Sequence, residues 1–132
     1  MILFSTDQGK NWQTIDTKVN ATILSIRKLA SGKLIAIGSK GLVLTSTDSG
    51  KNWRQISTPT TTLLRGPTQD PATGIVYLSG KSGEILYSKD DAETWQIMPS
   101  ITQASIKALY VDNKNHMLIG IGERQIRIPL LK

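Results

Sequence analysis

The sequence predicts an all-β fold made of four-stranded, antiparallel β-propeller blades, and two observations carry this prediction. The three tryptophans, Trp12, Trp53 and Trp95, are 41 and 42 residues apart, which is the length of one four-stranded blade, roughly 40–45 residues. Between them lie short apolar runs separated by Gly-rich turns, the pattern of short strands rather than helices. We therefore expect about three blades in the chain, with an incomplete ring.

The tryptophans end a recurring octapeptide, Ser-x-Asp-x-Gly-x-x-Trp, in which Ala92 replaces the glycine of the third copy. The aspartate can accept hydrogen bonds from amides of its own turn, and the glycine permits a positive φ. The tryptophan can bury its indole against the sheet while its N–H finds a partner. We expect Ala92 to weaken the third turn, since positive φ strains other residues. We interpret the motif residues as structural: Ser5, Asp7, Gly9, Trp12, Ser46, Asp48, Gly50, Trp53, Ser88, Asp90 and Trp95.

The strand pattern divides the chain, predicted to be a single propeller segment over residues 1–132, into four units. Residues 1–15 read as the last two strands of a blade, 20–56 and 62–98 as whole blades, and 105–132 as the first three strands of another. The strands of the second unit are expected at residues 22–29, 33–37, 42–45 and 53–56. The third unit contains an insertion, expected to be a loop over residues 66–74.

Such a chain would leave open sheet edges, which a soluble protein must cover. A propeller ring needs about four to eight blades. Either the chain is a piece of a longer propeller, or several copies close a ring together, and we favour self-association if the chain is whole. Two copies would bring three strands to meet two, so two strands would compete for the third position of the shared blade.

Composition excludes several kinds of site. The chain contains no cysteine, which excludes disulfides, zinc–thiolate sites and cysteine nucleophiles. No apolar run is long enough to span a bilayer, and the first residues lack the pattern of a signal peptide, so the compartment stays unknown. The formal charge of +6 favours acidic partners, although lysines in turns also serve solubility.

A search for catalytic chemistry finds no nucleophile elbow, phosphate-binding loop or paired carboxylates, so no catalytic, metal or cofactor site is expected. Glu84, Glu93 and Glu123 lie in or beside turns and are interpreted as solvated acids. His116 follows a turn sequence and is expected in a surface loop. Binding of single-stranded nucleic acid is not expected, because the cations are not interleaved with aromatic residues.

The phrase Gly-x-x-Gly-x-x-Leu-x-Ser-x-Asp-x-Gly-Lys-x-Trp, residues 38–53, resembles the Asp-box (BNR) repeats of Ycf48/HCF136-like propellers. Plant and cyanobacterial members of that branch assist photosystem II assembly, while bacterial relatives have no assigned role, and the resemblance implies a non-enzymatic scaffold that binds a protein. In such propellers the Asp-box lies at the blade periphery, and Asp-box proteins are often extracytoplasmic. Sialidases, sortilin-type receptors and some glycoside hydrolases also carry the box, which leaves a fragment of a carbohydrate enzyme and a glycan- or polyanion-binding propeller as alternatives.

Three cations give a candidate binding site of their own. In the first strand of successive units, Ser25-Ile26-Arg27, Leu63-Leu64-Arg65 and Ser105-Ile106-Lys107 align with a cation at the third position. Since the first strand of a blade usually lines the central channel, Arg27, Arg65 and Lys107 are expected to form a basic ring there, suited to an acidic protein partner. The alternative is that each is a solvated residue at a strand end.

Overall fold

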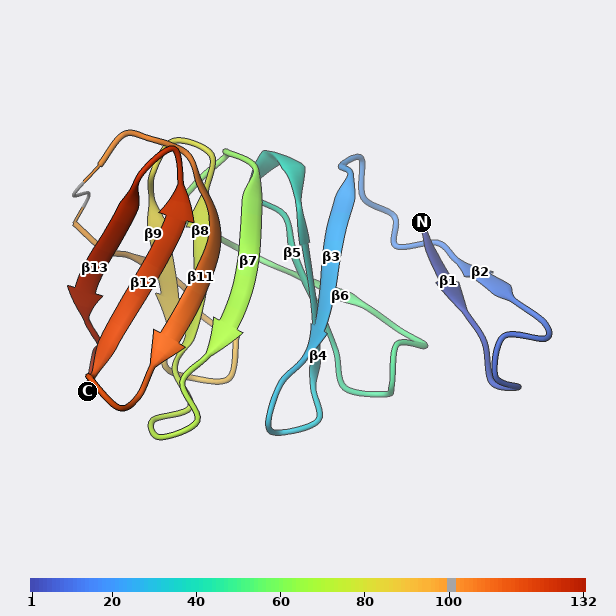
Figure 1. Ribbon diagram of the computed structural model, residues 1–132. Coiled ribbons are helices and arrows are strands. Elements are labelled where there is room, and N and C mark those ends of the chain that lie inside the picture. The colour runs from blue at the N-terminus through green and yellow to red at the C-terminus, as the bar shows by residue number, and fades with distance from the viewer. Residues whose placement is uncertain (100–101) are drawn as a thin grey trace.

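The computed structural model describes residues 1–99 and 102–132, and its strands lie in antiparallel sheets that follow one another along the chain (Figure 1). The first sheet pairs β1 (Ile2–Phe4) with β2 (Gln13–Ile15). The second consists of β3 (Ile23–Lys28), β4 (Leu34–Gly38), β5 (Val43–Ser46) and β6 (Arg54–Ile56). The third consists of β7 (Leu64–Gln69), β8 (Val76–Gly80), β9 (Ile85–Ser88) and β10 (Gln96–Ile97). The fourth consists of β11 (Ile106–Asp112), β12 (Met117–Gly122) and β13 (Gln125–Pro129).

The all-β prediction is confirmed: apart from a 3-10 turn at Ser39–Gly41, the regular elements of the described residues are strands. In the second sheet each strand lies within one residue of its expected bounds. The expected loop over residues 66–74 is wrong in its first half, because β7 continues to Gln69 and the turn follows at residues 70–74. A register shift between Arg65 and Thr68 accommodates one extra residue within the strand.

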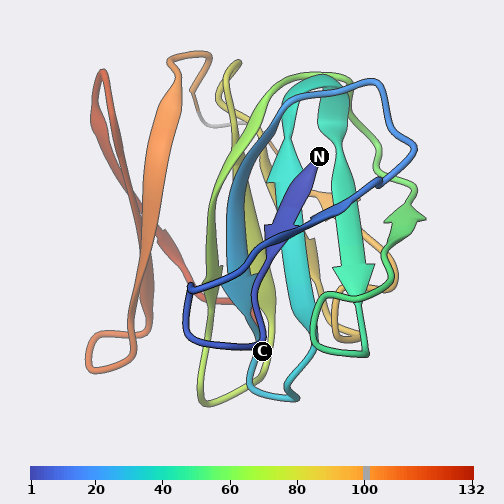
Figure 2. The same cartoon turned by 90° about the vertical axis from the view of Figure 1, so that its right-hand side faces the viewer.

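The sheets pack face to face, as the view turned by 90° shows (Figure 2). One apolar cluster joins Ile35 and Ile37 of the second sheet to Leu78 and Trp95 of the third. Another joins Tyr77 of the third sheet to the fourth, and a smaller cluster lies on the side of the second sheet that faces the first. Because β4 and β8 lie between covered faces, nearly every residue in them is buried.

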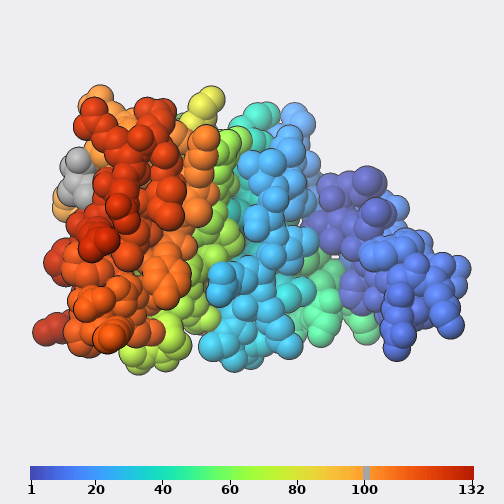
Figure 3. All heavy atoms as spheres, viewed as in Figure 1, coloured from blue at the N-terminus to red at the C-terminus, as the bar shows by residue number. Residues whose placement is uncertain are grey.

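The first sheet projects from one end of this stack, and the fourth sheet forms the other end (Figure 3). The first strands β3, β7 and β11 lie side by side, since β7 contacts both of the others. This arrangement places the innermost strand of each successive sheet on one common surface. The described residues include no helix long and apolar enough to cross a membrane.

Candidate functional site

The three repeated turns, residues 5–12, 46–53 and 88–95, share one hydrogen-bond pattern. In the second turn the Asp48 carboxylate accepts from the Asn52 amide at 2.9 Å, and the Ser46 hydroxyl donates to it at 2.8 Å. The same serine oxygen accepts from the Gly50 amide at 2.9 Å. Equivalent bonds recur around Asp7 and Asp90. The carboxylates thus accept hydrogen bonds from their own turns, as expected, and these bonds stabilise the backbone of each turn.

Each repeated turn also places two consecutive residues at positive φ. Ser49 and Gly50 have φ of 62° and 93°, and Asp91 and Ala92 have φ of 60° and 69°. Ala92 therefore adopts the left-handed conformation that strains a residue with a Cβ atom, as the sequence predicts. Its side chain is fully buried in the cluster between the second and third sheets, so packing offsets part of that strain.

Hydrogen bonds hold the turn carboxylates in their ionised form. The Asn52 amide and side chain and the Ser46 hydroxyl lower the pKa of Asp48 to about 2. Bonds from Asn11 and Ser5 lower the pKa of Asp7 in the same way. Burial opposes ionisation of Asp90, but bonds from Thr94 and Ser88 outweigh it and its pKa is lowered as well. A proton donor in catalysis needs the opposite shift.

The tryptophans of the repeated turns differ in burial although their local bonds are alike. Each indole N–H donates to the carbonyl three residues earlier, at 3.0 Å for Trp12, 2.9 Å for Trp53 and 3.2 Å for Trp95. Trp95 is 7% exposed, Trp53 is half-buried, and Trp12 is 59% exposed. The expectation that all three bury the indole is therefore wrong for Trp12. Trp95 packs on the four-stranded second sheet and Trp53 lies on the side facing the two-stranded first sheet, so burial follows how much sheet precedes each turn.

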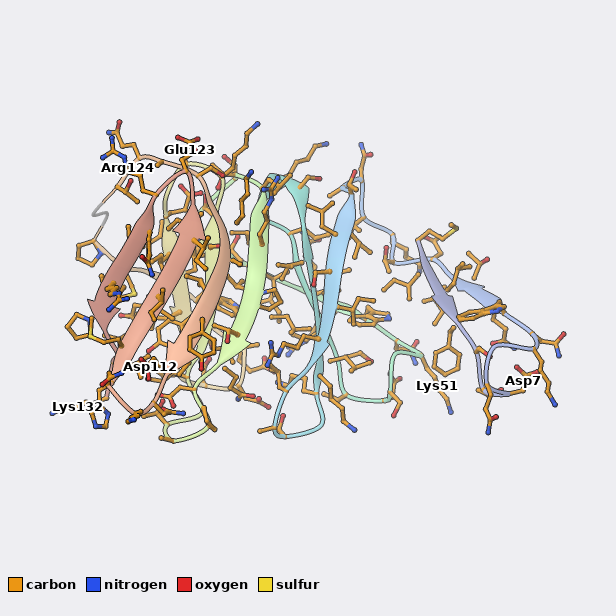
Figure 4. The ribbon with its side chains drawn as sticks, viewed as in Figure 1. Asp7, Lys51, Asp112, Glu123, Arg124 and Lys132 are labelled. Atoms are coloured by element: carbon orange, nitrogen blue, oxygen red, sulfur yellow. The ribbon has the colours of Figure 1, made fainter. Side chains whose placement is uncertain are left out.

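The cations Arg27, Arg65 and Lys107 lie on the adjacent inner strands β3, β7 and β11, and we call them the inner basic strip. Arg27 and Lys107 are exposed and Arg65 is half-buried. Asp112, at the end of β11, is the one acidic residue in these three strands. Its carboxylate accepts hydrogen bonds from the Asn115 amide and side chain, which lower its pKa. Figure 4 shows Asp112 at the end of the fourth sheet opposite to Glu123 and Arg124. The strip is therefore a surface of net positive charge.

The predicted common register of these cations is wrong. The glycines Gly38, Gly80 and Gly122 end the second strand of their sheets, and they pair with Ile23, Leu64 and Ile106. Counted from these pairs, Arg65 lies one rung along its strand, whereas Arg27 pairs with Ile35, three rungs along. Lys107 falls in a register shift between Ile106 and Ala108.

Counted from the glycine pairs, the register shifts of β3 and β11 fall at the same level, directly after Ile23 and Ile106, and that of β7 falls later. The sequence alignment set Arg27 beside Lys107, whereas the strand pairing sets it beside Tyr110, and this is why the alignment misplaced the ring. The cations descend diagonally from the Gly122 end of β11 towards the far end of β3. Tyr110 and Thr68 lie on the rung of Arg27. The site is therefore a sloping strip that crosses three strands rather than a ring at one level.

Contacts between sheets fix part of this strip in place. The Arg27 guanidinium donates to the carbonyl of Pro67 at 3.0 Å, and the Ala30 amide donates to the Gln69 side chain at 2.8 Å. Gly66 has a φ of 63°, and a Cβ atom there would lie 3.3 Å from the Ala108 backbone. The strands β3, β7 and β11 are thus closely fitted, and Arg27 joins two sheets as well as carrying charge.

An ionic cluster between the second and third sheets was not predicted. Glu93 pairs with Lys33 at 2.6 Å and with Arg54, and Lys33 also donates to the Asp91 carbonyl at 2.9 Å. Hydrogen bonds from Lys33 and Arg54 lower the pKa of Glu93. The interpretation of Glu93 as a solvated acid is wrong, and Glu84 likewise accepts bonds from Thr62 and Ser82. Glu123 is exposed, as expected.

One cavity, of about 520 Å³, lies beside the turns that follow β7 and β11, and its lining includes Asp70 and His116. Both carboxylate oxygens of Asp70 are engaged, by the Ala72 amide at 2.9 Å and the Thr73 hydroxyl at 3.0 Å. His116 is exposed in its turn, as predicted. Within the described residues, no group of three or more His, Cys, Asp or Glu could hold a metal ion.

Comparison with known proteins identifies the family of this chain. The model of the Sortilin-Vps10 family, described as sortilin, neurotensin receptor 3, matches residues 1–103. The chain belongs to the Sortilin-Vps10 family. A search of curated proteins gives no match.

Among solved structures, YCF48 from Cyanidioschyzon merolae matches with a TM-score of 0.65 and 16% sequence identity, over 98% of this chain and 48% of that one. This likeness confirms the propeller fold and the resemblance to Ycf48-like propellers at the level of fold. The chain spans about half the length of that protein.

Proposed function

We propose that this member of the Sortilin-Vps10 family is a non-enzymatic scaffold that binds an acidic segment of a protein partner along the inner basic strip. The observation that carries the proposal is the charge of the adjacent strands β3, β7 and β11. Their cations Arg27, Arg65 and Lys107 are exposed or half-buried, whereas the Asp112 carboxylate is bonded to its own turn. Such a surface attracts and orients negatively charged segments.

The carboxylates support binding over catalysis. Each carboxyl group with a resolved pKa shift, Asp7, Asp48, Asp90, Glu93 and Asp112, is shifted downward. Hydrolysis of a glycoside by two carboxyl groups requires one of them to keep its proton near neutral pH. The description of the family, sortilin and neurotensin receptor 3, also names a receptor.

The experiment is a titration of a fluorescent poly-glutamate peptide against the chain and two matched variants. Arg65→Glu/Lys107→Glu reverses two charges of the strip, and Lys10→Glu/Lys51→Glu reverses two charges in the repeated turns (Asp7 and Lys51 are labelled in Figure 4). Arg27 is left unchanged because it joins β3 to β7. We expect the first variant to lose at least tenfold in affinity, and the second to lose much less. Equal losses would show an effect of net charge alone and would contradict the proposal.

Two alternatives are tested with the same set of variants. Heparin oligosaccharide bound more tightly than the peptide, with the same dependence on Arg65 and Lys107, would favour a polyanion-binding propeller. Turnover of an aryl glycoside that persists through repurification would favour the carbohydrate enzyme. Capture of the peptide by the wild-type chain and failure of both alternatives would support the scaffold.

A further inference from the structure

Two apolar patches, at opposite ends of the stack of sheets, lack the cover that equivalent positions have inside it. One contains Leu24 and Ile26 of β3, and the other contains Tyr110 of β11 and Ile121 of β12. All four side chains are exposed, Tyr110 to 61%. Exposed patches of this kind usually mark an interaction surface.

The first patch lies beside the first sheet. Ile26 pairs with Ala36, which packs with Leu44 on the side of the second sheet that faces the first. The strands β1 and β2 are equivalent to the outer strands β5 and β6, because Ile2 pairs with Ile15 just as Val43 pairs with Ile56. The first sheet therefore covers the outer half of this face and leaves the inner strand β3 uncovered.

The second patch lies on the far face of the fourth sheet. Leu118 packs towards the third sheet, so its neighbours Ile119 and Ile121 point to the opposite face, and Tyr110 is the cross-strand partner of Ile119. The inner half of this face is therefore apolar. The corresponding faces of β3 and β7 each lie against the inner strand of the next sheet, and the far face of β11 has no such neighbour among the described residues.

The outer half of the same face is polar, and this distinguishes β13 from the other third strands. Gln125 pairs with Ile121 just as Val43 pairs with Ile37 and Ile85 with Ser79. At this position the third strands carry the buried residues Ile2, Val43 and Ile85, whereas Gln125 of β13 is exposed. Two residues on, Arg127 is also exposed. The far face of β13 is thus suited to solvent, although its near face packs Ile126 and Ile128 against the third sheet, whereas the far face of β11 and β12 is suited to cover.

We propose that a second copy of this chain completes the fourth sheet, with its β1 pairing to β12 in place of β13 and its β2 forming the fourth strand. The apolar residues on the core-facing side of the second copy's β1 then occupy the positions that Gln125 and Arg127 occupy in the single chain. Tyr110 and Ile121 meet the Leu24 and Ile26 patch of the second copy. The exchange is reciprocal, so both open ends of each chain are closed by one kind of contact.

This arrangement repeats contacts already present within the chain. The exposed Trp12 of the second copy reaches the third sheet, in the way that Trp95 packs on the second sheet. Two whole sheets from each chain and two shared sheets make a ring of about six blades, within the range of closed propellers. One chain covers 48% of the propeller protein it resembles, so two copies together approach its length.

Cysteine pairs test the register directly, because the chain has no cysteine of its own. Thr45 pairs with Ile35 in the second sheet, and the equivalent pair across the shared sheet is Phe4 with Ile119. Within one chain these two positions lie at opposite ends of the stack (Figure 1). We expect the double variant Phe4→Cys/Ile119→Cys to form a disulfide-linked dimer of twice 14.5 kDa, with the bond located by peptide mapping.

The competing arrangement retains β13 and pairs it with β2 of the second copy. By the pairing of Thr45 with Arg54, that arrangement would link the variant Gln13→Cys/Arg127→Cys instead. Efficient linkage of this second pair, or of neither pair, would overturn the proposal. Each single-cysteine variant is the control for random collision between molecules.

Light scattering of the wild-type chain and two variants gives an independent test. Tyr110→Asp changes the proposed interface and is expected to halve the mass. Ile97→Asp changes an exposed isoleucine on β10 and is expected to keep the dimer. A wild-type monomer, or a dimer that survives Tyr110→Asp with native circular dichroism, would overturn the proposal. The variant Arg65→Glu/Lys107→Glu is expected to keep the dimer mass, so failure of peptide binding and failure of assembly are distinguishable.

Discussion

The same substitution in two repeated turns should have very different costs, because Trp12 and Trp95 share local bonds but not neighbours. Each indole donates to the carbonyl three residues earlier. Trp95 lies in the core between the second and third sheets at 7% exposure, and Trp12 is 59% exposed. We predict that Trp95→Ala strongly destabilises the chain and that Trp12→Ala does so weakly.

The magnitudes follow from burial. Removing a large aromatic side chain from a packed core costs about 3–5 kcal/mol, since transfer and cavity terms add. Trp12, at 59% exposure, buries about two fifths of its roughly 150–250 Å², and at about 25 cal/mol per Å² this gives an upper bound of about 2.5 kcal/mol. No core cavity is left at Trp12, so we expect the two variants to differ by about 1.5–2.5 kcal/mol.

The assay is urea unfolding followed by far-ultraviolet circular dichroism, in a Tyr110→Asp background, which the proposed assembly expects to be monomeric. Trp12→Phe and Trp95→Phe serve as controls, because they remove the N–H donor and keep most of the packing. Equal free-energy losses for Trp12→Ala and Trp95→Ala would refute the argument that the preceding sheet determines the contribution of each turn. In the wild-type background, Trp12→Ala should also weaken the proposed dimer.

Three further predictions concern the turns and the contact between sheets. Hydrogen bonds lower the pKa of Asp48 to about 2. The ionised Asp48 should therefore stabilise the fold fully above the unfolded pKa of about 3.9, and this stabilisation should be lost as pH falls towards 2. The urea midpoint should fall over this range, and it should fall less in Asp48→Asn. Gly50→Ala should cost about 1–2 kcal/mol because φ is 93° there, whereas Ala92→Gly should be nearly neutral in urea unfolding, as relief of strain offsets a buried methyl worth about 0.8 kcal/mol. Glu93→Gln should cost less than about 1 kcal/mol in urea unfolding at low salt and still less at high salt, because Glu93 is 38% exposed.

The sequence was sufficient to predict the features that repeat with the period of the blade. The turn around Asp48, the donor role of the Trp53 indole and the bounds of β3–β6 depend on residues close in sequence. Such features are determined by local backbone chemistry, so each copy of the motif predicts them again. The positive φ of Ala92 was predictable for the same reason.

Features that depend on contacts between sheets were not predictable in this way. The ion pair between Glu93 and Lys33 joins residues in different units, and no spacing in the sequence predicts it. Arg27 lies four residues beyond Ile23, which pairs with Gly38, whereas Lys107 directly follows Ile106, which pairs with Gly122. Alignment by residue type alone could not detect which residues pair across the strands, and a register offset moves a residue to another rung.

The departures from the repeat are therefore the informative positions in this chain. A strict repeat would bury every turn tryptophan and place an apolar residue at the first position of every third strand. Instead, Trp12 is exposed and Gln125 is polar, and both departures lie at the ends of the stack. The inner basic strip departs in a different way, by a slope across three strands that are otherwise alike. The proposed assembly and the proposed partner binding thus rest on separate sets of residues, and each can be tested while the repeated turns that maintain the fold stay unchanged.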